Sequence, residues 1–170
     1  LVDLAERPRP GLHTLYVSPL KALAVDIARN LDAPIAEMNL PVTAETRTGD
    51  TPQHKRQRQR KTPPNLLLTT PESLSLLLSY ADAPRMFRHL SCVVIDELHE
   101  LAAGKRGDLL ALALSRLQAL VPSLRRVGLS ATIHDEDGFR RWLAPGADPD
   151  GVRIVHGAPG PKPLIDIARP

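Results

Sequence analysis

The sequence predicts an α/β fold in which a parallel sheet carries helices on both faces. Short apolar segments alternate along the chain with helical segments of roughly ten residues, which is typical of parallel strands joined by crossover helices. The segments Leu66–Leu68 and Cys92–Ile95 are apolar at every position, as strands buried on both faces are. Because ligands bind such sheets at the carboxyl ends of the strands, we expect chemistry at the strand-to-helix junctions.

Hydrophobic periodicity and turn residues indicate the order of the elements. A strand is expected over 15–17, followed by a helix over 20–31 whose apolar residues recur at helical spacing. The same order recurs four times, with strand and helix expected at 42–46 and 51–61, 66–69 and 71–80, 93–96 and 108–121, and 126–129 and 135–143. A last strand is expected over 152–155. The two wholly apolar segments are expected at the centre of the sheet.

The composition is that of one folded domain with an aliphatic core. The chain has 170 residues, of which 42% are hydrophobic and only 3% aromatic, so few rings are available to stack on bases and backbone contacts are favoured. Residues 1–158 are expected to form this domain, and the proline-rich residues 159–170 a connection toward a second domain. The segment that starts at Leu1 is typical of the end of a helix, which indicates a fragment.

Charge and cysteine content narrow the class of protein. A net charge of +3 does not by itself indicate a nucleic-acid partner, but residues 54–61 (HKRQRQRK) hold five cations and no acid. This basic segment is either a surface for a polyanion or a solvated helix face. Cys92 is the only cysteine, which excludes an intrachain disulfide, and no apolar stretch approaches the length of a membrane span. We therefore expect a cytoplasmic protein with no membrane partner.

Three strand-to-helix junctions share a design that suits phosphate groups. Ser18-Pro19 and Thr70-Pro71-Glu72 place a hydroxyl before a proline, as at a helix N-cap, and Asp50-Thr51-Pro52-Gln53 resembles a capping box. Each predicted helix start directs backbone N–H groups and the positive end of its dipole toward the same edge, and Lys21 adds a full charge. Any one of these junctions alone is more often an ordinary helix start, whereas the three together favour an edge that binds phosphates.

The fourth junction is acidic. The buried strand ends in Asp96 and Glu97, and a pair of carboxylates at that place suits Mg²⁺, which binds through one or two carboxylates, water and substrate phosphates. Asp96 can hold the hydrated ion while Glu97 polarises an attacking water; acids solvated at a strand end are the alternative. His99 and the residues after it are not a zinc protease motif, because Ala103 stands where the second histidine belongs.

The fifth junction, Gly128-Leu129-Ser130-Ala131-Thr132, carries two small hydroxyl side chains at the end of an apolar strand. Ser130 and Thr132 can hydrogen-bond a neighbouring acid or His99. Such hydrogen bonds would transmit changes at bound phosphates to the fifth junction. Taken alone, two hydroxyl residues after a strand are not a specific signal of this role.

Five segments taken in order resemble successive helicase motifs. They are SPLKAL (18–23), RTGDTP (47–52), LLTTPESL (67–74), VVIDELHEL (93–101) and GLSATI (128–133). Their order and spacing make the set similar to the Lhr-type, or large-helicase-related, DEXH-box helicases of superfamily 2, and above all to bacterial ligase-associated DEXH-box DNA helicases. The resemblance covers residues 14–143.

This resemblance implies a RecA-like P-loop NTPase domain that uses ATP and Mg²⁺. It assigns magnesium binding through water to Asp96, hydrolysis to Asp96, Glu97 and His99, and coupling of hydrolysis to strand movement to Ser130-Ala131-Thr132. The residues that it places along the track of the loading strand are Ser18, Pro19, Lys21, Gly49, Asp50, Thr51, Thr70, Pro71 and Glu72. The whole protein would be a 3′ to 5′ DNA helicase acting in DNA repair at the bacterial nucleoid. Its partners would be single-stranded DNA and a second RecA-like domain of the same chain.

One departure from the family pattern is large. The 170 residues contain no G-x-x-x-x-G-K-S/T phosphate loop, because Gly104-Lys105 is preceded by His99 where a glycine belongs and followed by Arg106 where Ser or Thr belongs. We expect the loop and its strand upstream of Leu1 and the second motor domain elsewhere in the parent chain, so that the fragment alone does not hydrolyse ATP. Loss of that first strand is expected to leave the two wholly apolar segments open to pairing with other chains, and the fragment prone to aggregation.

Two other interpretations stay open. The chain can be a nucleic-acid-binding module without ATPase activity, built on the three helix starts and the basic segment. It can also belong to an RNA-directed DEXH helicase that acts on RNA or a DNA/RNA hybrid, because contacts to a phosphate backbone do not by themselves distinguish the sugar.

Overall fold

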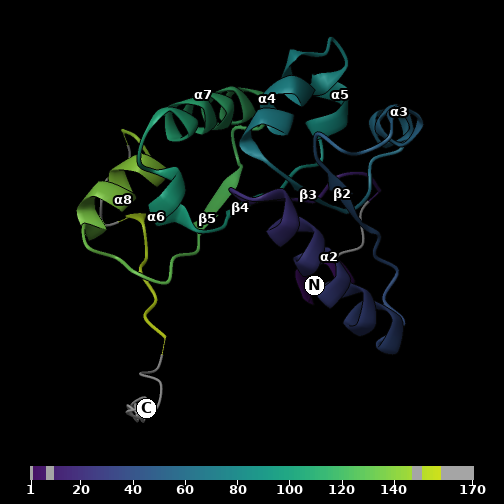
Figure 1. The fold of residues 1–170 in the computed structure, drawn as a ribbon, viewed down its shortest axis with the longest axis horizontal. Helices are drawn as coiled ribbons and strands as arrows, with labels where there is room; N and C mark the ends of the chain where they lie inside the picture. Colours follow the sequence, from purple (N-terminus) through teal and green to yellow (C-terminus); the bar gives the residue numbers. More distant parts are fainter. Residues whose placement is uncertain (1, 7–9, 147–150, 158–170) are drawn as a thin grey trace, which may run out of the picture.

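The structure, a computed structural model, describes residues 2–6, 10–146 and 151–157. Its sheet has five strands in the order β2-β3-β1-β4-β5, and neighbouring strands all pair in parallel (Figure 1). The strands are β1 Thr14–Val17, β2 Ala44–Arg47, β3 Leu66–Thr69, β4 Cys92–Ile95 and β5 Arg125–Gly128. The helices are α1 Val2–Glu6, α2 Lys21–Glu37, α3 Gln53–Lys61, α4 Pro71–Ser79, α5 Ala83–Phe87, α6 Leu98–Leu101, α7 Lys105–Leu120 and α8 Glu136–Leu143. The expected connection over 159–170 lies outside the described residues.

Helices cover both faces of the sheet, as the sequence predicts. Successive residues of a strand face opposite sides. Leu15, Leu67 and Val93 belong to the core formed with α4, α5 and α7, whereas Tyr16 and Leu66 belong to the core formed with α2. Figure 1 shows α4 and α7 on one side of the strands and α2 on the other. The α/β class with a parallel sheet is therefore confirmed.

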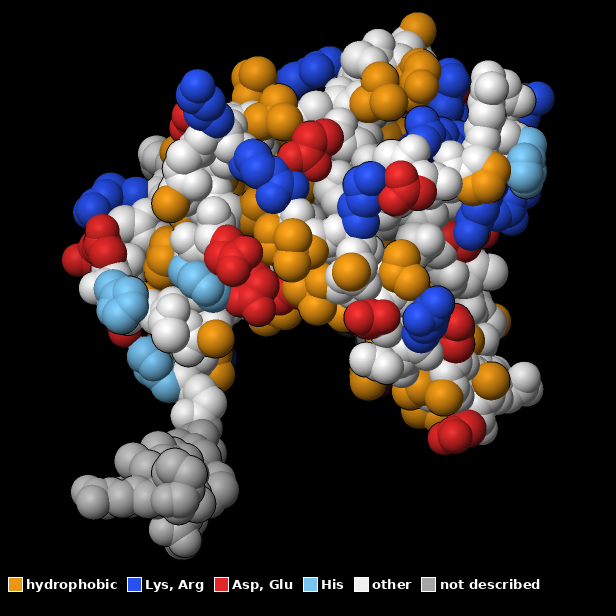
Figure 2. Space-filling view, viewed as in Figure 1, with side chains coloured by type: hydrophobic (Ala, Val, Ile, Leu, Met, Phe, Trp, Pro, Cys, Tyr) orange, Lys and Arg blue, Asp and Glu red, His pale blue; other side chains and the backbone are white. Residues whose placement is uncertain are grey.

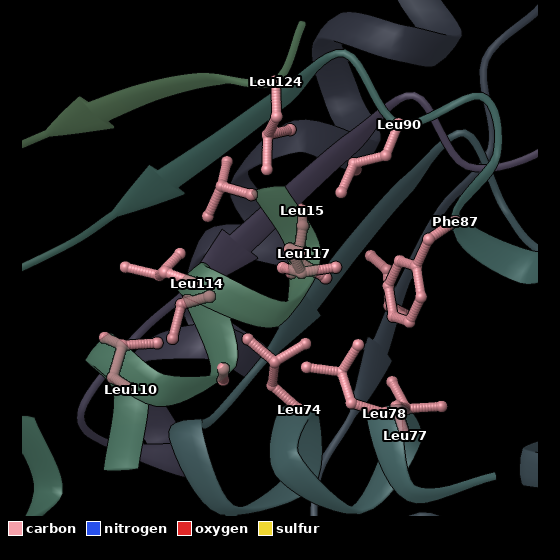
Figure 3. Close-up of a cluster of buried hydrophobic side chains, with 14 of the residues drawn as sticks. Leu15, Leu74, Leu77, Leu78, Phe87, Leu90, Leu110, Leu114, Leu117 and Leu124 are labelled. Carbon is pink, nitrogen blue, oxygen red and sulfur yellow. The ribbon is translucent and has the colours of Figure 1, made fainter. Parts of the chain in front are cut away.

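Leucines of α7 and α4 form the centre of the larger core (Figure 3). Leu110, Leu114 and Leu117 recur at helical spacing on one face of α7, and they pack toward Leu74 and Leu77 of α4. All five side chains are buried. Burial of a leucine contributes roughly 1.5–3 kcal/mol relative to exposure, so this layer holds α4 and α7 firmly on the sheet.

One of the three predicted helix caps forms. Thr70 precedes α4, its hydroxyl accepts the backbone N–H of Ser73 at 3.5 Å, and Pro71 is the first helical residue. The caps predicted at Ser18 and at Asp50 are wrong. Helices α2 and α3 begin later, after Leu20 and Pro52, and neither start has a capping side chain.

Five of the six expected strands and all of the longer helices expected with them are present, with ends that differ by a few residues. Helix α2 continues through Pro34 to Glu37, past its expected end at residue 31. The short helices α5 and α6 were not expected, because four or five residues are too few to show a helical period. The strand expected over 152–155 is wrong, since these residues pair with no strand among those described.

The two wholly apolar strands flank the centre of the sheet. The central strand is β1, which pairs with β3 on one side and β4 on the other. Strand β3 is also paired with β2, and β4 with β5, so neither has an open edge. The expectation that Leu66–Leu68 and Cys92–Ile95 are left open is therefore wrong. Among the described residues, the open edges belong to β2 and β5.

No helix within the described part of the chain is long and apolar enough to cross a membrane.

Candidate functional site

All five strand-to-helix junctions meet at one edge of the molecule. Because every strand pair is parallel, the carboxyl ends of the five strands lie along the same side of the sheet. The junctions that follow β1, β2 and β3 therefore lie along the same edge as the acidic junction that follows β4, and the junction after β1 is next to it. This common edge is the geometric requirement of the predicted site, and the structure meets it.

The junction after β1 is a turn that precedes its helix. Ser18 is buried, and its hydroxyl donates to the carbonyl oxygen of Leu20 at 3.3 Å instead of capping α2. Its own backbone N–H donates to Thr69 of β3 at 3.0 Å, which ties the turn to the next strand. Since α2 has no capping side chain, its first backbone N–H groups remain free to meet a ligand at this edge.

Lys21 joins the first two junctions. Its Nζ lies 3.0 Å from Oδ1 and 3.1 Å from Oδ2 of Asp50, which follows β2. Both side chains are largely exposed, at 54% and 75%, so the pair contributes little to stability. Gly49 allows the close approach, because a Cβ there would lie 3.3 Å from that Nζ.

The turn after β2 is held by its own polar groups. Thr51 is buried, and its hydroxyl accepts the backbone N–H of Thr48 at 2.9 Å, which explains why it does not cap α3. Arg56 donates from Nε to the carbonyl oxygen of Thr51 at 2.6 Å and from Nη2 to that of Gly49. Arg56 of α3 thus holds the turn that precedes this helix.

The basic segment is less free than its composition suggests. Arg58 lies 2.6 Å from Glu45, Arg60 lies 2.7 Å from Asp82, and the guanidinium of Arg60 also stacks 3.8 Å from the ring centre of Tyr80. These carboxylates come from other parts of the chain and offset much of the local charge. The predicted continuous positive face is therefore partly neutralised in the folded protein.

A buried arginine underlies this segment. Arg47, the last residue of β2, is 2% exposed, and burial lowers the pKa of its guanidinium. It donates to the carbonyl oxygen of Arg56 at 2.8 Å, while its Nη2 has no hydrogen-bond partner within the described residues.

The junction after β3 carries a carboxylate that is already paired. Glu72, in the first turn of α4, accepts from Nε of Arg106 at 2.7 Å. The same guanidinium donates from Nη2 to the carbonyl oxygen of Pro19 at 2.8 Å. A residue from the start of α7 therefore connects the junctions after β1 and β3.

The acidic junction after β4 has a constrained backbone. Glu97 adopts left-handed dihedral angles, φ 47° and ψ 50°, which a residue with a side chain rarely occupies. Its N–H donates to Oδ1 of Asp96 at 3.0 Å, and the N–H of Asp96 donates to Val17 of β1 at 2.9 Å. Such strain persists where the surroundings impose it and is common at functional sites.

Tyr16 supports Asp96 from the neighbouring strand. Tyr16 is opposite Val94, so Asp96, two residues further on, faces the same side of the sheet. Burial and a hydrogen bond to the Asp96 carboxylate together raise the pKa of Tyr16 well above its usual range. The phenol therefore stays protonated and donates to Asp96.

The acidic pair lacks a cation of its own. Within the described residues, no lysine or arginine lies within 4.0 Å of Asp96 or Glu97, and only His99 approaches, 3.5 Å from Glu97. No group of three or more metal-ligating side chains occurs in the same residues. One or two carboxylates with open positions fit Mg²⁺, which keeps waters and shares phosphate oxygens.

His99 links the acidic junction to the junction after β5. Its Nδ1 lies 2.9 Å from the hydroxyl of Ser130, and that hydroxyl donates to the carbonyl oxygen of Thr132 at 2.7 Å. Because the hydroxyl has one hydrogen, it accepts from His99, whose Nδ1 is therefore protonated. The predicted contact between these two junctions is confirmed for Ser130.

Gly128 brings β5 against the helix that follows the acidic pair. A Cβ at Gly128 would lie 2.6 Å from Cδ2 of Leu98, the first residue of α6. The N–H of Leu98 donates to the carbonyl oxygen of Leu129 at 2.8 Å. The fourth and fifth junctions are therefore packed against each other and joined by a hydrogen bond.

Sequence reasoning missed two residues of this edge, Tyr16 and Arg106. Tyr16 was visible as the polar position of an otherwise apolar strand segment, but its partner depends on the order of the strands. Arg106 gave no local signal, since its partners are 34 and 87 residues away in the sequence.

Comparisons with known proteins agree with this geometry. A family model described as "DEAD/DEAH box helicase" matches residues 1–138. The chain is 44% identical over 155 residues to "Lhr helicase/ probable uracil glycosylase" of Mycolicibacterium smegmatis, covering 85% of this chain and 10% of the relative. It is 46% identical over 169 residues to "Lhr helicase/uracil glycosylase" of Escherichia coli, covering 92% and 11%.

A solved structure supports the fold. The structure of M. smegmatis helicase Lhr bound to ssDNA and AMP-PNP has a TM-score of 0.74 and 42% sequence identity, covering 83% of this chain and 20% of that one. The chain thus spans about a tenth of the two curated relatives named above.

Proposed function

Because the chain belongs to the DEAD/DEAH box helicase family and is similar to Lhr helicases, we propose that it forms part of the first motor domain of an ATP-dependent DNA helicase. In this proposal residues 1–158 belong to the RecA-like domain and 159–170 lead to a second motor domain. The intact protein would move 3′ to 5′ along single-stranded DNA and act in DNA repair at the nucleoid.

One observation carries the proposal. The carboxylates of Asp96 and Glu97 share one edge of a parallel sheet with the starts of α2, α3 and α4. A nucleotide bound at the two carboxylates and a phosphate backbone bound at the three helix starts would therefore lie on one continuous surface. This is the arrangement that a motor coupling hydrolysis to strand movement requires.

On the nucleotide side, Asp96 would hold a water of the metal ion, oriented by the Tyr16 hydroxyl. Glu97 would accept a proton from the attacking water, held in place by its left-handed backbone. Bound Mg²⁺ would supply charge that stabilises the phosphate oxygens. The hydrogen bond between His99 and Ser130 would couple ATP hydrolysis at this site to the segment Ser130-Ala131-Thr132, which is proposed to move the strand.

A phosphate loop has a place to bind beside these residues. Of the two open sheet edges in the described residues, the edge of β5 is one strand from β4 and its acidic pair, whereas β2 is three strands away. Val94 and Val127 are opposite each other and only half-buried. Figure 2 shows a hollow with hydrophobic side chains along its wall, between the part formed by α2 and the part formed by α6 and α8. We therefore place the strand and helix of the phosphate loop along β5 and in this hollow.

On the strand side, backbone groups would carry most of the phosphate contacts. Lys21 adds a cation at the start of α2, and Thr70 and Pro71 fix the start of α4. The remaining track residues would be Ser18, Pro19, Gly49, Asp50, Thr51 and Glu72. Contacts of this kind bind any base sequence. The similar M. smegmatis helicase is bound to single-stranded DNA in its solved structure, which favours DNA over RNA as the strand.

Substitution of the catalytic base tests this function. In the full-length protein, Glu97→Gln is expected to lower DNA-stimulated ATP hydrolysis at least ~100-fold, because a carboxamide cannot accept the proton. Binding of a labelled single strand should stay unchanged. The matched control is Glu100→Gln, at an exposed acid in helix α6, which begins directly after Glu97. Full hydrolysis in Glu97→Gln contradicts the proposed role. An unaltered protein that binds DNA without any ATP hydrolysis would instead be a binding module.

A further inference from the structure

Arg106 lies where three segments of the site edge meet. It is the second residue of α7, and its guanidinium reaches Glu72 of α4 at 2.7 Å and the carbonyl oxygen of Pro19 at 2.8 Å. The two acceptors belong to two of the segments proposed to hold the DNA strand. One side chain, from outside both segments, thus contacts both of them.

The ion pair between Arg106 and Glu72 neutralises a negative charge on the surface proposed to bind the DNA strand. The side chain of Glu72 is 53% exposed on a surface proposed to bind phosphates, where an unpaired carboxylate would repel the strand. Burial raises the pKa of Glu72, but hydrogen bonds from Arg106, from its own backbone and from Thr70 together lower it. The carboxylate is therefore charged, and Arg106 is the cation that offsets it.

The start of α7 is itself held against the acidic junction. A Cβ at Gly107 would lie 2.1 Å from the carbonyl oxygen of Leu101, the last residue of α6, so only glycine permits this contact. Helix α6 begins directly after Glu97. Arg106 therefore reaches the proposed strand track from a helix that packs on the end of α6, the helix that follows Glu97.

We propose that Arg106 is a positioning residue of the strand track, which neutralises Glu72 and holds the Pro19 turn against α4. In this arrangement the starts of α2 and α4 present their backbone N–H groups to one strand at a fixed separation. The inference rests on the proposed function, and it also assigns Glu72 the role of a partner for Arg106. Arginine suits the position because its planar fork reaches two acceptors at once, which the single ammonium group of lysine does not.

Strand binding by charge-altered variants tests the inference. In the full-length protein, Arg106→Ala is expected to weaken binding of a labelled single DNA strand about ten-fold, which is the usual scale for hydrogen bonds to charged groups. Lys105→Ala removes an exposed neighbouring cation that makes no ion pair with the described residues, so binding should change by no more than about three-fold. At saturating DNA, the hydrolysis rate of Arg106→Ala should recover to near that of the parent protein.

A second substitution separates positioning from loss of structure. Glu72→Gln introduced into Arg106→Ala should restore part of the lost affinity, because it removes the carboxylate that Arg106 leaves exposed. Arg106→Lys, which keeps the charge but loses one contact, should bind with intermediate affinity. A general structural defect would not be repaired by a second change at Glu72.

Two negative outcomes have different meanings. If the unaltered protein is stimulated by DNA but Arg106→Ala binds like Lys105→Ala, or gains nothing from Glu72→Gln, the role of Arg106 is wrong and the helicase function stands. If the unaltered protein neither binds single strands nor hydrolyses ATP, the proposed function fails, and the inference on Arg106 fails with it.

Discussion

The two halves of the site edge balance their charges in different ways. In the half formed by β2, β3 and β1, exposed cations lie on carboxylates of the protein itself. These pairs are Lys21 with Asp50 and Arg106 with Glu72. In the half formed by β4 and β5, Asp96 and Glu97 have no lysine or arginine within ion-pair distance among the described residues.

This difference indicates which ligand each half suits. A cation paired within the protein adds little net attraction, so phosphate contacts on the first half would fall to backbone N–H groups and would not depend on base sequence. Two carboxylates without a protein cation attract one from outside, which fits the magnesium of a bound nucleotide. In the proposed function, strand binding and hydrolysis would thus occupy two different halves of one edge.

Gly107, where α7 packs on α6, should be the position at which substitution has the largest effect on stability. Gly107→Ala is expected to lower the free energy of unfolding by about 2–3 kcal/mol, because the added Cβ would collide with the backbone of Leu101. Alanine is otherwise the better helix former, so an increase in stability would contradict the packing. Chemical denaturation of the 170-residue chain, followed by circular dichroism, measures the effect. Gly151→Ala is the control, since no heavy atom lies within 4 Å of that position.

Loss of the tyrosine support should affect hydrolysis alone. Tyr16→Phe removes the hydrogen bond to Asp96 while keeping the ring, and changes of this type cost roughly ten-fold in metal affinity or activity. In the full-length protein, the Mg²⁺ concentration for half-maximal hydrolysis should rise by about that factor. Strand binding without nucleotide should not change. An equal loss in the Mg²⁺ dependence of hydrolysis and in strand binding would show that the two halves of the edge do not act separately.

Lys21 should give the smallest effect. Because its ammonium is shared with Asp50, Lys21→Ala is expected to weaken strand binding only about three-fold, equally for all DNA sequences. The slope of log affinity against log salt concentration should fall by at most about one ion, because Asp50 already offsets part of the charge of Lys21. Lys61→Ala serves as the control, because Lys61 is the last residue of α3 and the first residue of that helix is the one at the site edge. A loss of affinity that varies with DNA sequence would argue against backbone contacts.

Local patterns predicted the fold class and most elements. All five expected strands from 15–17 to 126–129 are present, because alternation and apolar runs depend on neighbours in the sequence. The start of α4 at Thr70-Pro71 was predicted correctly for the same reason. Caps at Ser18 and Asp50 were not predicted correctly. Ser18 donates to Leu20, and the turn at Asp50 is held by the bond from the Thr48 N–H to the Thr51 hydroxyl and by the bond from Arg56 to the Thr51 carbonyl oxygen.

The sequence by itself determined that this protein has a parallel sheet with an acidic junction at Asp96 and Glu97, because parallel topology alone brings all strand ends to one edge. Only the tertiary structure decided the partners across that edge. The order β2-β3-β1-β4-β5 puts Tyr16 beside Asp96, and the packing of Gly107 on α6 lets Arg106 reach Pro19 and Glu72. Such contacts join residues far apart in the chain, so strand order and helix packing, and no local pattern, determine them.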